Sequence, residues 1–446
     1  MNKTEAVLSR NRLVRTFGAQ IYNQAVTIAV QLALVPVLLY FWGTERYGVW
    51  ILLSAIPTYL TFADLGFTMA AKNVMTIKVA EGNRSGAVVT YQSIFMLLNA
   101  VIGVALLLLV GVVPFLKISG IFALGSTKEA SAIAVLILLA INVLLTQYLL
   151  LFASGLRSAG RPAEEVFWSA SARLMEGVAT VIAASWNEDI VAAALAIVAN
   201  RIAFNFVVWL RLRFLEPWLA LGIRHASLDE TRRLFHPSLS FMLVSIGQAL
   251  TIQGPVVILG AIGTPIQVVI FSTSRTLARL GTSAINMVNF TFTPEYSRLY
   301  GLERFQQFAR LARLHISGTI AVTIVYVGTL NVSGGVLLAT WTHRRVVAEQ
   351  PFFFLLLLAV AFEMLWSAAL MPLASINQHI AASRIFSFLS IVGLATSYTA
   401  CKWYDGSLVA VTAPLLGLHM LVTAFVIVQL WFRLRAVSRQ FRIDKE

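Results

Sequence analysis

The sequence predicts an all-α polytopic membrane protein with about twelve transmembrane helices in two six-helix lobes. The chain has 446 residues, of which 58% are hydrophobic and only 12% charged. Its apolar runs are about 20 residues long, the length that crosses a bilayer core. Strand-like alternation in blocks of about ten residues does not occur. Because backbone polar groups in lipid must bond within their own segment, these runs are expected to be helices.

Reading apolar windows against helix-breaking residues places the individual spans. Only the short turn Ile262-Gly263-Thr264-Pro265 separates the seventh span from the eighth. The twelve predicted spans are 17–42, 48–70, 86–116, 130–154, 164–184, 190–210, 238–262, 266–290, 314–340, 351–374, 383–400 and 408–432.

The distribution of basic residues predicts the orientation. With the N-terminus inside, the inner segments hold 24 of the 34 Lys and Arg residues and the outer loops hold 6. This bias predicts that both termini are cytoplasmic. The net charge of +14 is therefore mostly topogenic and lipid-facing, and predicts no nucleic-acid partner.

The longest inner connection divides the chain. We expect an N-terminal lobe at 1–210, a connection at 211–237, a C-terminal lobe at 238–432 and a basic cytoplasmic tail at 433–446. Trp218, Leu219, Leu221 and Ile223 lie among arginines in the connection, a pattern typical of an interfacial helix.

The missing motifs argue for a carrier and against an enzyme. The sequence contains no GxxxxGK[ST] phosphate loop, and its six histidines show no metal-ligand spacing. No long soluble segment exists to hold a catalytic site. We therefore expect no enzymatic activity, no metal and no cofactor beyond a coupling proton or sodium ion.

Four arginines lie near the middle of predicted spans: Arg173, Arg201, Arg275 and Arg279. A cation at the bilayer centre costs about 2.5–3.5 kcal/mol on insertion scales. Such residues normally face water, a partner or an anionic cargo. Four of them predict a transport path for a negatively charged substrate.

Arg275 and Arg279 are four residues apart and share a helical face. Two adjacent cations repel each other, so water or a polyanion would stabilise the pair. Guanidinium binds phosphate oxygens through a planar fork, which lysine lacks. Structural ion pairing is the alternative interpretation.

The other two arginines have polar neighbours. Arg173 and Glu176 are three residues apart and can neutralise each other. Arg201 has Asn205 on its own face, and Glu176 of the neighbouring helix is a second candidate partner. Both arginines are candidates for extending the cationic path.

The first span carries a polar stripe. Gln20, Gln24, Thr27 and Gln31 recur at helical spacing, with Asn23 beside them. The stripe is expected to line a wet path or, alternatively, to bind neighbouring helices.

Three intramembrane carboxylates are candidates for proton or sodium coupling: Asp64, Glu176 and Glu363. Each of them can alternatively offset an arginine.

Two short segments resemble the polysaccharide-exporter branch of the multidrug/oligosaccharidyl-lipid/polysaccharide flippase superfamily. The first is 45–73 with its flanks, which matches a G-x-Y-G-x-W/Y pattern followed by D-x-G. The second is TPEYSRLYG at 293–301, placed like the Pro-Glu-x-Ser stretch of that family. The residues that match the first pattern are Gly43, Tyr47, Gly48, Trp50, Asp64 and Gly66.

The resemblance implies two six-helix lobes that form a V-shaped central cleft, lined largely by the first, second, seventh and eighth helices. This would bring the Gln20–Gln31 stripe, Asp64 and the Arg275/Arg279 pair around one cavity. It further implies a bacterial inner-membrane flippase that moves undecaprenyl-diphosphate-linked oligosaccharide (an O-antigen, capsule or exopolysaccharide repeat unit) to the outer leaflet by alternating access. Membrane lipids, glycosyltransferases and a polysaccharide polymerase are the partners that it implies.

Two other functions are compatible with the sequence. A cation-coupled drug antiporter of the same fold would carry amphipathic cations, for which an arginine excess is a poor match. A non-transporting scaffold for polysaccharide-assembly enzymes would not depend on the intramembrane charges.

Overall fold

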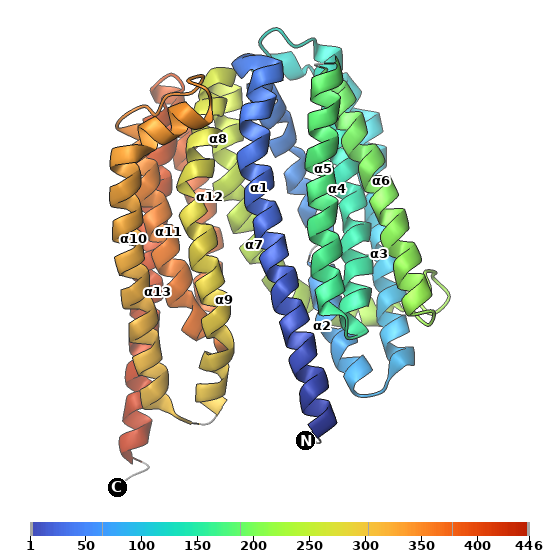
Figure 1. Cartoon of the computed structure of the whole chain (residues 1–446). Helices are drawn as coiled ribbons and strands as arrows, with labels where there is room; N and C mark the ends of the chain where they lie inside the picture. Colours follow the sequence, from blue (N-terminus) through green and yellow to red (C-terminus); the bar gives the residue numbers. More distant parts are fainter. Residues whose placement is uncertain (1–2, 65, 188, 302, 377, 444–446) are drawn as a thin grey trace. The chain divides into compact units, whose positions relative to one another are not determined.

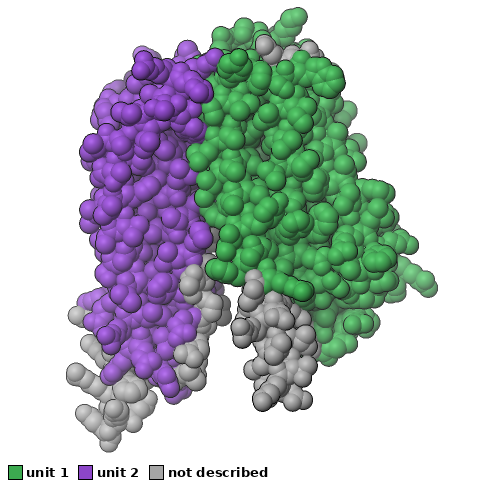
Figure 2. Space-filling model, in the orientation of Figure 1, with its two compact units in different colours: residues 1–245 green, residues 246–446 purple. Residues whose placement is uncertain are grey.

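The structure, a computed structural model, describes residues 3–64, 66–187, 189–301, 303–376 and 378–443. It is built from α-helices, with three short 3-10 helices between them (Figure 1). This confirms the predicted all-α class. The chain forms two compact units, residues 1–245 and 246–446, which Figure 2 colours separately.

Thirteen α-helices follow one another in the described ranges. Their bounds are α1 Lys3–Ala55, α2 Phe67–Ala80, α3 Arg84–Val112, α4 Glu129–Ser158, α5 Pro162–Asn187, α6 Ile190–Leu215, α7 Leu228–Ile262, α8 Pro265–Ala278, α9 Leu280–Gly301, α10 Phe305–Trp341, α11 Phe352–Ser375, α12 Ile380–Trp403 and α13 Leu408–Ile443. The 3-10 helices are η1 Pro57–Asp64, η2 Val113–Phe115 and η3 Ile118–Gly120.

Each unit has its own apolar core. In unit 1, Tyr91 and Leu98 of α3 pack with Leu151 and Phe152 of α4. In unit 2, Trp366 of α11 packs with side chains of α12 and α13, among them Phe386 and Leu418. Helices α5 and α6, which carry Arg173 and Arg201, contribute Ala172 and Val208 to the core of unit 1.

Nine segments of the described chain are long and apolar enough to cross a membrane. They correspond to nine of the predicted spans and support a multi-pass membrane protein. The other three predicted spans are 48–70, 164–184 and 266–290. Residues 164–184 form the continuous helix α5, which carries four charged side chains.

Residues 48–70 do not form one continuous helix, so that prediction is wrong. Helix α1 continues past a kink at Gly43 (φ 68°, ψ 177°) to Ala55, and η1 and the start of α2 follow. Gly66 has φ 75° and caps the N-terminus of α2. Both glycines adopt left-handed φ values, which side chains with a Cβ rarely take. Two of the three glycines in the first matched pattern, Gly43 and Gly66, thus mark a kink in α1 and the start of α2.

The connection 211–237 contains no separate interfacial helix, which corrects that prediction. Its first residues complete α6, 216–227 have no α-helical structure, and α7 begins at Leu228. The segment is fixed to α3, because Gln92 donates to the carbonyl of Ala220 (3.1 Å) and accepts from the backbone N–H of His225 (2.8 Å). Leu219 is buried in the unit 1 core. Trp218 and Leu221 pack against the same core, whereas Ile223 is exposed.

Residues 266–290 are divided into α8 and α9, contrary to the prediction of one span. Arg279 occupies the junction as the C-cap of α8. The N-terminus of α8 has a complete capping box, in which the Thr264 and Gln267 side chains each bond the other's backbone N–H. Arg275 lies in the last turn of α8 and Arg279 at its end.

Candidate functional site

A triangle of polar side chains joins three helices in the middle of unit 1. Arg201 of α6 forms a short ion pair with Glu176 of α5. Its Nε also donates to Asn142 Oδ1 of α4 (3.1 Å), and Asn142 Nδ2 donates to Glu176 Oε1 (3.3 Å). Each of the three side chains therefore contacts the other two. This confirms the expectation that Glu176 can serve as the partner of Arg201.

Asn205, predicted to share the face of Arg201, contacts a different group. Its Nδ2 donates to the backbone carbonyl of Leu145 on α4 (2.8 Å). It therefore fixes α6 against α4 and contributes a structural bond one turn from the triangle.

Arg173 bonds to α1. Its Nη1 donates to Thr27 Oγ1 (2.5 Å) and to Asn23 Oδ1 (3.4 Å). The Thr27 hydroxyl donates in turn to the Asn23 carbonyl (2.7 Å), so its oxygen is free to accept from the guanidinium. Asn23 and Thr27 are one helical turn apart, which places both on the α1 face that meets α5.

The arginine charge in this region exceeds the carboxylate charge. Arg173 and Arg201 face one described carboxylate, Glu176, which Arg201 and Asn142 engage. Arg173 is solvent- or lipid-exposed within its unit and contacts only neutral groups through the two bonds described above. A guanidinium in this setting favours an anion, because an anion supplies the missing charge and can accept from the remaining N–H groups.

The predicted glutamine stripe lies on α1 close to this arginine. Gln20 and Gln24 are half-buried and Gln31 is exposed. Asn23 and Thr27 are the members of this region that contact Arg173. Their spacing of four was visible in the sequence, but the helix that they meet was not.

In unit 2, Arg279 pairs with the second intramembrane carboxylate. Its Nη1 lies 2.7 Å from Glu363 Oε2 of α11, and both side chains are mostly buried. Arg279 is at the α8–α9 junction, so this pair holds the junction against α11. Glu363 thus offsets an arginine in this structure, the alternative anticipated from the sequence.

Arg275 contacts a different helix from Arg279. It donates a short hydrogen bond to the backbone carbonyl of Ile252 on α7, and its Cζ lies 5.4 Å from the centre of the Phe271 ring. The bonded carbonyl lies in the turn that precedes Pro255, where the proline disturbs the helical hydrogen bonds. The two arginines of this helix therefore have separate contacts, to α7 and to α11.

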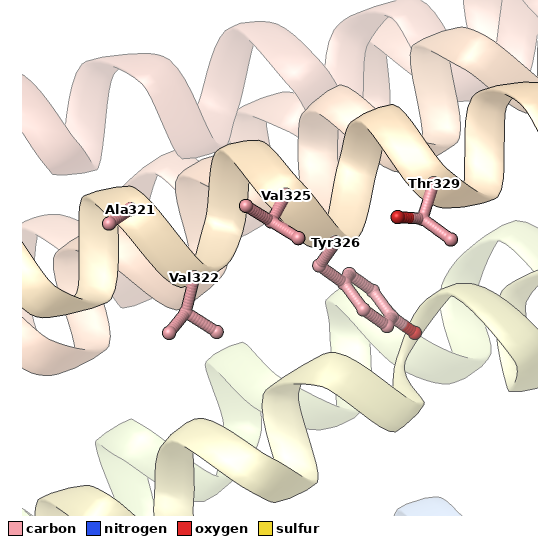
Figure 3. Close-up of a pocket in the computed structure, with 5 residues that line it drawn as sticks. All are labelled: Ala321, Val322, Val325, Tyr326 and Thr329. Atoms are coloured by element: carbon pink, nitrogen blue, oxygen red, sulfur yellow. The ribbon is translucent and has the colours of Figure 1, made fainter.

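Tyr326 of α10 fastens the α8–α9 junction from a third side. Its hydroxyl lies 2.9 Å from the carbonyl oxygen of Leu277 and 3.2 Å from that of Ala278. Figure 3 shows Tyr326 extending from α10 toward a neighbouring helix, beside a cavity of about 450 Å³ lined by Ala321, Val322, Val325, Tyr326 and Thr329. The cavity is apolar, which suits lipid chains, and the tyrosine hydroxyl bonds carbonyls at the end of α8.

A buried histidine lies near the Arg279–Glu363 pair. Trp366, three residues after Glu363 on α11, donates its indole N–H to His419 Nδ1 of α13 (3.1 Å). Because indole is only a donor, Nδ1 of His419 is the acceptor of this bond. His419 is an isolated histidine in an apolar helix, so no spacing pattern in the sequence marks it.

Asp64 is the last residue of η1, and its side chain lies outside the described residues. In the described ranges, no group of three or more His, Cys, Asp or Glu side chains is arranged to hold a metal ion.

Ion pairs at the helix ends hold unit 1 together outside the spans. Lys78 of α2 contacts Glu230 of α7 (2.6 Å), and Thr90 of α3 donates to the same Oε1 (2.5 Å). Burial opposes the charged form of Glu230. The bonds from Lys78 and Thr90 and the nearby positive charges outweigh burial, so the pKa of Glu230 lies below its usual value. Glu230 is therefore a charged structural group at neutral pH.

Comparisons with known proteins give a match at the level of structure. The chain matches no protein-family model and no curated protein. The inward-facing structure of a multidrug resistance MATE family transporter of the MOP superfamily aligns with a TM-score of 0.69 at 13% identity, over 93% of this chain and 99% of that one. A MATE structure in the bent conformation aligns with a TM-score of 0.63 at 12% identity, over 97% and 96%. A mutant of the Vibrio cholerae MATE transporter VcmN gives 0.60 at 13%, over 98% and 99%.

These similarities extend over nearly the whole length of each chain. At 12–13% identity they establish the architecture and carry no information on the substrate. The chain therefore has the fold of MATE transporters of the MOP superfamily.

Proposed function

We propose that this chain is a bacterial inner-membrane flippase for an undecaprenyl-diphosphate-linked oligosaccharide. In this proposal both termini are cytoplasmic, and alternating access moves the headgroup from the inner to the outer leaflet. The supporting observation is Arg173, an exposed cation in the middle of α5; the carboxylate three residues away on the same helix, Glu176, is engaged by Arg201.

The chemistry around Arg173 suits a diphosphate that carries sugars. Phosphate oxygens accept the planar N–H groups of a guanidinium. Asn23 and Thr27 offer an amide and a hydroxyl beside it, and Gln20 and Gln24 lie within a turn on the same helix. Amides and hydroxyls can exchange their present partners for sugar hydroxyls without leaving a charge unpaired.

The arginines of unit 2 form the second part of the proposed path. Arg279 is paired with Glu363, and Arg275 contacts a carbonyl and an aromatic ring. A diphosphate could replace either contact during transport, since it carries more charge than the groups it displaces. Glu363, Glu176 and Asp64 remain candidates for coupling this exchange to a proton or sodium ion.

A cation-coupled drug antiporter is the second candidate. The solved structures that share this fold include a multidrug resistance transporter, and intramembrane carboxylates are available at Glu176 and Glu363. That function would require a carboxylate to exchange its arginine for a cationic substrate. The surplus of arginine over described carboxylate favours the anionic cargo.

The test compares Arg173→Gln and Arg173→Lys with an Arg313→Gln control in proteoliposomes. Arg313 is an exposed arginine of α10 whose side chain bonds only its own helix in the described structure. The probe is a fluorescent polyprenyl-diphosphate trisaccharide whose leaflet is read by quenching from outside. A charge-assisted bond is worth about 1.5–3 kcal/mol, so Arg173→Gln should slow transfer by roughly tenfold or more.

The transfer rate of Arg173→Lys should be intermediate, because lysine keeps the charge but lacks the planar guanidinium. The rate of Arg313→Gln should match that of wild type. Equal rates for wild type and Arg173→Gln would contradict the role of Arg173. Proton-driven uptake of an amphipathic cation, with no transfer of the diphosphate probe, would support the antiporter instead.

A further inference from the structure

An apolar groove runs between α1 and α5 and begins beside Arg173. The two helices pack against each other along much of their length (Figure 1). The groove has a volume of about 230 Å³, and all its lining side chains are apolar. Ala29, Val30 and Ala33 line it from α1, and Leu174, Gly177 and Val181 line it from α5.

Small residues create the groove. A Cβ on Gly177 would lie 3.3 Å from Val30 Cγ1, so the glycine allows the two backbones to approach closely at this point. Ala29 and Ala33 are exposed and carry only a methyl group each, which leaves the space beside that contact open. The result is an open apolar groove along the seam between the two helices.

One end of the groove is cationic, because Arg173 and its partner on α1 come just before the lining residues of their helices. Arg173 precedes Leu174, and its partner Thr27 is two residues before Ala29. The polar contact of Arg173 with α1 therefore lies next to one end of the groove. From there the lining extends to Ile182, about 12 Å farther along α5. A cation followed by an apolar groove of this length matches the charged head and the apolar chain of an anionic amphiphile.

The depth of Arg173 distinguishes between two kinds of amphiphile. Arg173 is eleven residues from the start of α5 at Pro162, or about 16 Å along the axis. The hydrocarbon core of a bilayer is about 30 Å thick, so this position is near its middle. A resident phospholipid keeps its phosphate at the interface. A phosphate that reaches Arg173 therefore belongs to a lipid whose head has left the interface.

We infer that the α1/α5 groove is a chain-binding subsite of the transported lipid. The cargo phosphate next to the chain contacts Arg173, and the first part of the alkyl chain lies along Ala29, Ala33 and Gly177. The inference rests on the proposed function and adds to it a protein surface that guides the lipid tail during head transfer. Binding of the chain in this groove lowers the cost of holding the charged head at the bilayer centre.

The test fills the groove without altering Arg173. Ala33→Trp and Ala29→Phe each place an aromatic ring in the groove from an exposed position. Ala203→Trp on α6 is the matched control, because Ala203 is also an exposed alanine and does not line the groove. Thermal unfolding of all three variants in detergent checks that they are folded.

The probe is a polyprenyl phosphate with a diazirine on its first isoprene unit. The neutral polyprenol with the same diazirine is the uncharged control probe. Both are cross-linked to the full-length protein in nanodiscs, and the labelled peptides are mapped. We expect the phosphate to label segments 29–34 and 174–182 about tenfold more than the alcohol, as one charge-assisted bond predicts. Ala33→Trp and Ala29→Phe should remove this labelling and slow the transfer of the diphosphate probe, whereas Ala203→Trp should change neither.

Equal labelling by phosphate and alcohol would overturn the inference, because it would identify the groove as a site for any bilayer chain. Normal transfer by both groove-filled variants would also overturn it, while leaving the proposed function intact. Specific labelling of the groove in a protein that transfers no diphosphate lipid would leave the subsite standing and would contradict the proposed function.

Discussion

Glu176 forms its ion pair with Arg201 of α6, although Arg173 lies one turn before Glu176 on α5. Asn142 stabilises this ion pair, since it accepts a hydrogen bond from Arg201 and donates one to Glu176. One carboxylate thus neutralises the more buried arginine. The more exposed arginine is left to polar groups of α1, which is why it is the stronger candidate for an anionic ligand.

This pairing predicts unequal effects of neutralising its two members. Glu176→Gln leaves two arginines without a carboxylate, whereas Arg201→Gln leaves Glu176 with Arg173 one turn away. Removing one partner of a buried ion pair costs about 3–5 kcal/mol. We expect Glu176→Gln to approach this cost and Arg201→Gln to cost clearly less, in thermal unfolding of the purified protein.

The double variant Arg173→Gln/Arg201→Gln provides the control for this prediction. It leaves Glu176 with neither arginine and should be less stable than Arg201→Gln alone. If Arg201→Gln and the double variant unfold at the same temperature, Arg173 does not substitute for Arg201.

The Arg279–Glu363 pair should tolerate exchange of its charges. A hydrogen bond between charged groups contributes about 1.5–3 kcal/mol, so Arg279→Gln and Glu363→Gln should each destabilise the protein by about this amount. Arg279→Glu combined with Glu363→Arg keeps one charge of each sign and should recover part of the loss. Recovery of stability without recovery of lipid transfer would separate the structural role of the pair from a role in the cargo path.

Sequence hydropathy was sufficient to predict the all-α class and nine of the spans. It also singled out four arginines within predicted spans, because the cost of inserting a cation is independent of its partner. It could not assign their partners. Arg173 and Thr27 are 146 residues apart in sequence, and their contact depends on how α1 packs against α5. No short sequence pattern predicts a contact of this kind between two helices that are distant in the sequence.

The division of span 266–290 was missed for a similar reason. Arg279, at the junction, is a good helix former, and neither glycine nor proline stands at that position. The junction depends on Tyr326 of α10 and on Glu363 of α11, which bind it from outside. Gly43 and Gly66, by contrast, break the first helices through their own backbone conformation, and both belong to the pattern that the sequence revealed.

Glu230 should make the stability of unit 1 depend on acid pH. Its pKa is lower in the folded state, where Lys78 and Thr90 outweigh the effect of burial, than its unfolded value of about 4.3. Its stabilising contribution is therefore fully present above that value and is lost as the pH falls through the folded pKa. Glu230→Gln should lower the unfolding temperature at pH 7 and change it progressively less as the pH falls below about 4.

Asp229→Asn is the control for this prediction. Asp229 is adjacent in sequence and pairs with Arg232, but both side chains are about four-fifths exposed. Exposed pairs of this kind contribute at most about 1 kcal/mol. A pH-independent difference between Glu230→Gln and wild type would contradict the proposed origin of the stabilisation.

Tyr326 and Gly281 should be energetically coupled at the α8–α9 junction. A Cβ on Gly281 would lie 2.6 Å from Cε1 of Tyr326, so Gly281→Ala forces the ring away from the carbonyls of Leu277 and Ala278. Overpacking of this kind costs about 1–3 kcal/mol. Tyr326→Leu removes both the ring and the hydroxyl, after which the added methyl group meets less resistance. In a double-mutant cycle measured by chemical unfolding, the loss in the double variant should be smaller than the sum of the single losses by about 0.5–3 kcal/mol.

Gly328→Ala on α10, where a Cβ meets no atom within 4 Å, is the control and should be neutral or slightly stabilising. Additive losses at Gly281 and Tyr326 would show that the tyrosine does not fix the junction, and that Arg279 and Glu363 hold it without help from α10.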